Sequence, residues 1–89
     1  MMIDPNFVLR EVAGETLLIS LADISETKRL LCLNEIGREI FLLLKQGREE
    51  EQIVNALLEE YAVGEDTLRD DVREFLTELE RFGVLRDRA

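Results

Sequence analysis

The stretch Arg29–Gln46, RLLCLNEIGREIFLLLKQ, joins a short apolar strand directly to an amphipathic helix. The apolar run ends at Leu33, and Asn34 is well suited to cap the following helix because its side chain accepts hydrogen bonds from backbone amides two or three residues later. Apolar residues then recur at helical spacing up to Gly47, a residue type that ends many helices in the left-handed conformation. The stretch therefore predicts a strand that ends at Leu33 and a helix over Glu35–Gln46.

Two more strands are predicted before this stretch. Phe7–Val12 has the composition of a strand, Gly14 supplies a tight turn, and Thr16–Leu21 follows with apolar residues at alternate positions. These two segments form a predicted hairpin, and Arg29–Leu33 is the third strand. Because helices begin directly after it, we expect the third strand at an edge of the sheet, where its outward backbone donors and acceptors have no partner strand.

The third strand is apolar on both faces. Leu31 and Leu33 lie on one face, and Leu30 and Cys32 lie on the other. The second face either docks a partner or packs against a loop of the same chain, and the sequence leaves both readings open. Cys32 is the single cysteine of a chain without histidine, so no base activates it, and we interpret it as a small buried or semi-buried hydrophobic residue.

Two amphipathic helices complete the chain. The first is predicted over Glu49–Tyr61, and the second over Glu65–Phe82, where Gly83 ends it. Val84 and Leu85 are expected to fold back onto the core. The order of elements predicts an α+β fold in one domain over residues 1–89, with a three-stranded antiparallel sheet followed by three helices.

Charge and composition argue against several classes of protein. The net charge of the 89 residues is −9, and residues 47–80 alone hold three basic and twelve acidic side chains. A surface of this sign repels phosphate, so we expect no nucleic-acid partner. No run of 18 apolar residues is present and the start lacks the pattern of a signal peptide, so we expect no membrane partner and a cytoplasmic location.

The residues that usually carry chemistry are absent. The chain has no histidine and one cysteine, which leaves no ordinary metal site and no nucleophile with a base. No glycine-rich loop follows a strand to hold a phosphate. The sequence thus indicates a protein without catalytic residues, cofactor or metal, whose function lies in a binding surface.

Several motifs follow one another along the chain: L-N-E-x-G at Leu33–Gly37, I-F-L-L-L at Ile40–Leu44, Gly47, E-x-x-I-V-x-x-L-x-x-E-Y at Glu50–Tyr61 and D-V-x-x-F-L-x-x-L-x-x-x-G at Asp71–Gly83. Together they resemble the PqqD-like family, the small peptide-recognition proteins of pathways that modify ribosomally made peptides. The resemblance extends over Phe7–Leu85. Each motif alone is an ordinary cap or core pattern, but their order and spacing are distinctive.

The resemblance implies a winged-helix-like domain that binds the leader segment of a precursor peptide as an added strand beside the third strand. It also implies delivery of that precursor to a modifying enzyme, either a radical S-adenosylmethionine (radical SAM) protein or a leader peptidase, with no chemistry done by the domain itself. The peptide-binding residues carried over by position are Arg29, Leu30, Leu31, Cys32 and Leu33 on the strand, with Arg69, Val72, Arg73 and Leu76 on the last helix.

Arg69 and Arg73 lie one turn apart in an otherwise acidic helix. They either form a basic notch for an acidic side chain of the leader, or they pair locally with the acidic residues of the same helix, Glu65, Asp66, Asp70 and Glu74. Two other functions also stay open at this stage: a winged-helix DNA-binding regulator, and a scaffold module that forms a homodimer through the strand edge.

Overall fold

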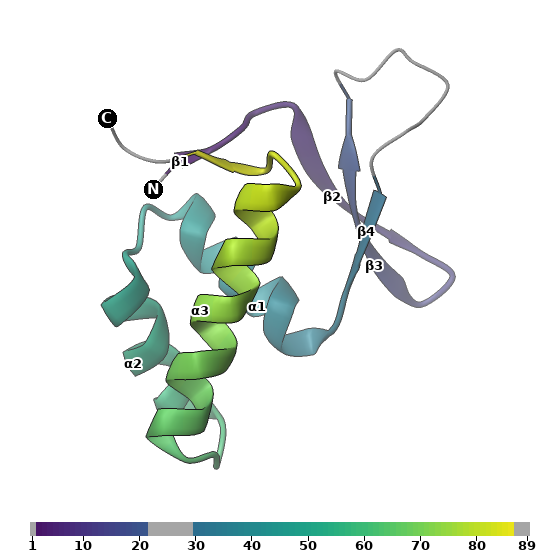
Figure 1. The fold of residues 1–89 in the computed structure, drawn as a ribbon. Coiled ribbons are helices and arrows are strands. Elements are labelled where there is room, and N and C mark those ends of the chain that lie inside the picture. The colour runs from purple at the N-terminus through teal and green to yellow at the C-terminus, as the bar shows by residue number, and fades with distance from the viewer. Residues whose placement is uncertain (1, 22–29, 87–89) are drawn as a thin grey trace.

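The computed structural model describes residues 2–21 and 30–86. In these residues three helices pack together on one side of a three-stranded sheet, and a small two-stranded sheet lies near the two chain ends (Figure 1). The elements are β1 (Met2–Ile3), β2 (Phe7–Val12), β3 (Glu15–Ser20), β4 (Leu30–Leu33), α1 (Glu35–Lys45), α2 (Glu50–Glu60), α3 (Glu65–Arg81) and β5 (Leu85–Arg86).

The larger sheet is antiparallel with the order β2–β3–β4. Phe7 is opposite Ser20 at one end of the hairpin, and Thr16 is opposite Leu33 where β3 meets β4. The hairpin turn has positive φ at both Ala13 and Gly14, which matches the right-handed twist of the two strands. The predicted α+β fold, with an antiparallel sheet followed by three helices, is confirmed, and winged-helix-like describes it only loosely.

The prediction that the third strand lies at an edge is also confirmed. Within the described residues β4 pairs with β3 and with no other strand. Its opposite flank therefore carries backbone N–H and C=O groups that no strand of the described chain satisfies.

The helices cover only one face of this sheet. Leu18 and Leu33 point toward them and are buried, whereas Leu30 on the opposite face is 52% exposed. Cys32 shares that opposite face and is exposed. Our interpretation of Cys32 as a buried or semi-buried residue was therefore wrong, because an apolar neighbourhood in the sequence does not show which face of a strand the helices will cover.

One core joins the sheet to the helices. Side chains from every helix meet there, among them Phe41 of α1, Ile53 of α2 and Val72 of α3, which are completely buried. Burial of a side chain of this size stabilises the fold by about 1.5–3 kcal/mol. The apolar stripe of each predicted helix thus faces the same interior, and this packing fixes α3 relative to α1 and β4.

The chain ends are tied together by an element that the sequence did not reveal. Val84 and Leu85 fold back onto the core as expected, and Leu85–Arg86 also pairs with Met2–Ile3 as β5 and β1. The Asp4 carboxylate accepts hydrogen bonds from the Asn6 N–H and the Arg86 guanidinium, both at 2.9 Å. These two contacts lower the pKa of Asp4. Strands of two residues are too short to show a sequence pattern.

We predict that Asn34→Ala destabilises the fold by about 1 kcal/mol. The Asn34 Oδ1 atom accepts a hydrogen bond from the Gly37 N–H at 2.7 Å, and alanine would leave that amide of the first helical turn without its side-chain acceptor. Urea unfolding measures the change. Asn55→Ala is the control because Asn55 is an exposed residue inside α2. Equal stability of the two variants would contradict the role of Asn34.

Candidate functional site

The open flank of β4 is the first part of the candidate site. Along the strand Leu30 and Cys32 are exposed, Leu31 is half-buried and Leu33 is buried. Strands that pair with a peptide contribute mainly backbone groups, so side-chain burial does not remove a residue from this role. Arg29, the first predicted strand residue of the site, lies outside the described residues.

A groove lies directly after β4, between α1 and α3. Its volume is about 320 Å³. The α1 side contributes Asn34, Ile36, Gly37 and Ile40, and the α3 side contributes Asp71, Glu74, Phe75 and Glu78. The groove therefore combines apolar side chains from both helices with three carboxylates from α3.

Phe75 lies against the backbone of α1 at Gly37. A Cβ atom added to Gly37 would lie 3.2 Å from the Phe75 Cε1 atom and 3.1 Å from the Asn34 Oδ1 atom, closer than most real contacts of this kind. Glycine inside a helix is unfavourable by about 1 kcal/mol relative to alanine. Its presence here allows the Phe75 ring to approach α1 and to form the wall of the groove.

The structure does not bring the predicted helix residues to this groove. Val72 is 0% exposed and Leu76 is 5% exposed, and both belong to the core. Their side chains leave almost no surface for a peptide. The residues of α3 that do line the groove, Asp71, Glu74, Phe75 and Glu78, occupy a neighbouring face of the helix. Only the position of α1 distinguishes these two faces, and the sequence pattern does not contain that information.

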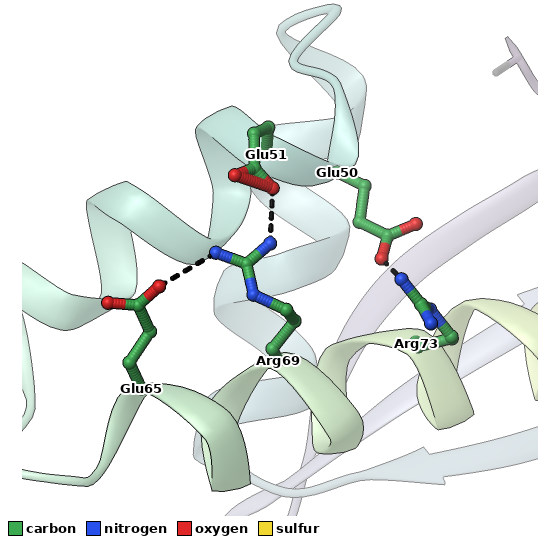
Figure 2. A network of polar contacts seen from close by, with 5 residues as sticks. All are labelled: Glu50, Glu51, Glu65, Arg69 and Arg73. Carbon is green, nitrogen blue, oxygen red and sulfur yellow. Dashed lines mark hydrogen bonds and ion pairs between the residues drawn. The ribbon is translucent and has the colours of Figure 1, made fainter.

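Arg69 and Arg73 are directed toward α2 (Figure 2). Arg69 donates hydrogen bonds to Glu51 of α2 and, at 2.9 Å, to Glu65 one turn earlier in α3. Arg73 donates through Nε to Glu50 at 3.4 Å. The local pairing of Arg69 with Glu65 is confirmed, while the two glutamates of α2 are partners that the sequence did not identify.

The ion pairs change the acidity of their members. The hydrogen bond from Arg69 lowers the pKa of Glu51 below its ordinary value of 4.5, and both carboxylates raise the pKa of Arg69. Arg69 thus bridges two helices as a permanent cation, and its guanidinium is already occupied. These contacts leave little basis for a notch that binds an acidic peptide side chain.

The Cys32 thiol has an acidic neighbour on the adjacent strand β3. Its Sγ atom donates to the Glu15 carboxylate at 3.5 Å. Partial desolvation and this carboxylate raise the pKa of the thiol, so Cys32 stays protonated at neutral pH. Its position on the outer face of β4 makes it a chemical marker for that strand.

In residues 2–21 and 30–86, no three acidic or cysteine side chains are placed to hold a metal ion. None of the helices in the same residues is long and apolar enough to span a membrane.

We predict that Arg69→Gln lowers the melting temperature more than Arg73→Gln, because Arg69 joins two carboxylates and Arg73 joins one. Glu51 has a lowered pKa in the folded state, so its contribution to stability is complete above the ordinary value of 4.5 and is lost as the pH falls through the lower value. Thermal unfolding followed by circular dichroism should show a difference in melting temperature between the variants at pH 7, and this difference should narrow as the pH falls below 4.5. A larger effect of Arg73→Gln would contradict this assignment.

One family model and two solved structures match this chain. The sequence matches the PqqD family, described as Coenzyme PQQ synthesis protein D, over residues 15–85. The fold is similar to that of TbiB1, solved in complex with the TbiA(beta) leader peptide, with a TM-score of 0.82 and 31% identity over 100% of this chain and 99% of that one. It is also similar to lasso peptide synthetase B1, solved with its leader peptide, with a TM-score of 0.78 and 18% identity over 96% and 95% of the two chains. Comparison with curated protein sequences gives no match. The match over residues 15–85 and the likeness to TbiB1 along the whole chain show that this protein belongs to the PqqD family.

Proposed function

We propose that this chain is a non-catalytic peptide-binding protein that captures the leader segment of a ribosomally made precursor peptide. The observation that carries the proposal is the open flank of β4 beside a groove between α1 and α3. The likeness to TbiB1, a relative solved with a leader peptide, supports it. Because such precursors are made on ribosomes, we place this capture in the cytoplasm.

The leader would bind as an extra strand of the sheet. Its backbone pairs with the outward N–H and C=O groups of β4, and its side chains alternate between the groove and the outer face of the sheet. A strand of four residues directs alternate residues outward, which gives about four hydrogen bonds of roughly 0.5–1.5 kcal/mol each. With two apolar side chains at about 1.5–3 kcal/mol each, and several kcal/mol lost on ordering the peptide, we expect a Kd in the micromolar range.

The helix side of the site is revised from the sequence-based expectation. We assign the apolar contacts of the leader to Ile36, Ile40 and Phe75, which line the groove. The peptide-binding strand residues Leu30 to Leu33 stay as proposed. We do not assign Val72 and Leu76 to the peptide-binding site because they lie in the core. We do not assign Arg69 and Arg73 to it because they pair with glutamates.

No observation favours the two alternative functions, which are DNA binding and self-pairing into a homodimer. The groove face of α3, the helix that a DNA-binding reading would place on DNA, carries three carboxylates, which phosphate would avoid. A homodimer through the β4 edge would block the same flank that the leader needs, so sedimentation with and without peptide separates self-pairing from peptide capture.

We predict that Cys32, the single thiol of the chain, will form disulfides with cysteines placed at every second position of a bound leader. The probe is the leader segment of a precursor peptide that binds this protein, made as a series with one cysteine at each successive position. Since side chains of an added strand alternate between faces, disulfides with Cys32 should form at every second position of one short segment. Mass spectrometry under mild oxidation at about pH 8.5 identifies the products, a pH chosen because a raised thiol pKa slows exchange at neutral pH.

Cys32→Ser is the matched control and should abolish every adduct without changing peptide affinity. Trapping at consecutive positions, or with no preferred segment, would show that the leader is not held as a regular strand against β4. Absence of any leader binding would contradict the proposed function itself.

We further propose that the captured leader is presented to a modifying enzyme, either a radical SAM protein or a leader peptidase. An apolar row crosses the outer face of the sheet beside the proposed binding strand. Val8 and Ile19 are half-buried and Leu30 is exposed, and the three are aligned across β2, β3 and β4. Exposed apolar surface of this kind is typical of a protein interface.

We predict that Ile19→Lys weakens delivery but not capture. A lysine on the outer face would place a charge in the proposed enzyme interface, while the flank of β4 and the groove stay unchanged. The leader Kd should remain within about twofold, and the rate at which the modifying enzyme acts on the precursor should fall at least tenfold. Asn55→Lys, which adds the same charge on an exposed position of α2, is the control. Equal modification rates for wild type and Ile19→Lys would contradict this interface.

A further inference from the structure

On helix α3, the pair Arg69 and Arg73 lies on a different face from the three carboxylates that line the groove. Arg69 and Arg73 are directed toward α2 and are bonded to glutamates there (Figure 2). Asp71, Glu74 and Glu78 line the groove on another face. The helix therefore offers cations to its own chain and anions to whatever enters the groove.

The groove carboxylates have no cation of the described chain bonded to them. Asp71, Glu74 and Glu78 are exposed, and none of them takes part in an ion pair found in residues 2–21 and 30–86. The groove lining contains no lysine or arginine. Arg38 follows Gly37 in the sequence of α1, but it lies in a separate hollow. There its Nε atom is 3.5 Å from the Glu11 carboxylate.

The groove also has room for an aliphatic stem. Ile36, Ile40 and Phe75 supply apolar surface directly beside the three carboxylates. Long basic side chains suit such a site, because their methylene groups pack on apolar surface while the charged end reaches an anion. The ring of Phe75 is a further attractive surface for a cation.

From this arrangement we infer that the guest peptide is recognised partly by charge, through a lysine or arginine that lies in the groove against Asp71, Glu74 and Glu78. This inference rests on the proposed function and specifies its substrate as a leader with a basic residue at one fixed position of the added strand. It reverses the sign of the notch considered from the sequence, where Arg69 and Arg73 would have selected an acidic side chain.

The size of the effect follows from exposure. Single ion pairs at a protein surface change affinity by about 1.4-fold to 5-fold. Three carboxylates around one cation, in a partly apolar groove, should together change it by about 3-fold to 30-fold. The preference should decrease with added salt, since exposed charges are screened.

A peptide selection tests the inference without knowledge of the natural leader. Phage-displayed random peptides of about 12 residues are selected on the wild-type protein and on Asp71→Asn/Glu74→Gln/Glu78→Gln, and binders are retained only if a cysteine placed in them is trapped by Cys32. Glu59→Gln/Glu60→Gln/Asp70→Asn removes the same charge from exposed positions outside the groove and is the matched control. Circular dichroism confirms that all three proteins are folded.

The expected result is enrichment of lysine or arginine at one register position with wild type and control, and loss of that enrichment with the groove variant. A synthetic peptide from the selection should bind the groove variant about 3-fold to 30-fold more weakly than wild type, and replacement of its basic residue by norleucine should abolish the difference. Trapped binders with alternating apolar residues but no basic preference would overturn the inference and leave the proposed function intact. An equal loss in the control variant would also overturn the inference, and failure to obtain any trapped binder would overturn both.

Discussion

Within residues 2–21 and 30–86, β4 has a partner strand on one side only, and the proposed binding role depends on this open flank. A free strand edge is normally a hazard, because it offers backbone groups to any other chain. Here the edge is four residues long, and it ends in a capped helix that is fixed in the core. The chain also carries a net charge of −9, which opposes close approach of a second copy. Such an edge suits a guest strand whose side chains also fit the groove.

The position of α3 turns this edge into a site. Its buried stripe is fixed in the core by residues such as Val72 and Leu79, and Arg69 and Arg73 form ion pairs with α2. These contacts leave a third face of the helix to form one wall of the groove opposite α1. Gly37 allows the Phe75 ring to lie against the backbone of α1, where it lines the groove. Stability and the proposed peptide binding are therefore assigned to different faces of the same helix.

Most of the fold was predictable because its signals are local. The cap at Asn34, the glycines at helix ends and the alternation of apolar residues predicted the three strands of the larger sheet and all three helices to within one or two residues. The edge position of β4 was predictable from element order alone. The β1–β5 pair was not predictable, since each of these strands has only two residues and shows no alternation of apolar and polar side chains.

The site was only partly predictable because it depends on tertiary geometry. The apolar stripe of α3 contains both Val72 and Phe75, and only the placement of α1 makes the first a core residue and the second a groove residue. The same holds for Arg69, whose spacing to Glu65 is visible in the sequence while its contact with Glu51 is not. Cys32 was misplaced because a strand that is apolar on both faces does not reveal which face the helices cover.

Amide hydrogen exchange at β4, measured by NMR, tests the central claim most directly. In the free protein the N–H groups of Leu30 to Leu33 that face β3 should be protected and the alternate, outward-facing ones should exchange rapidly. Addition of a bound leader should protect those outward amides while the pattern in β2 stays unchanged. Protection of all four amides in the free protein, or no change at β4 when the leader binds, would contradict the account.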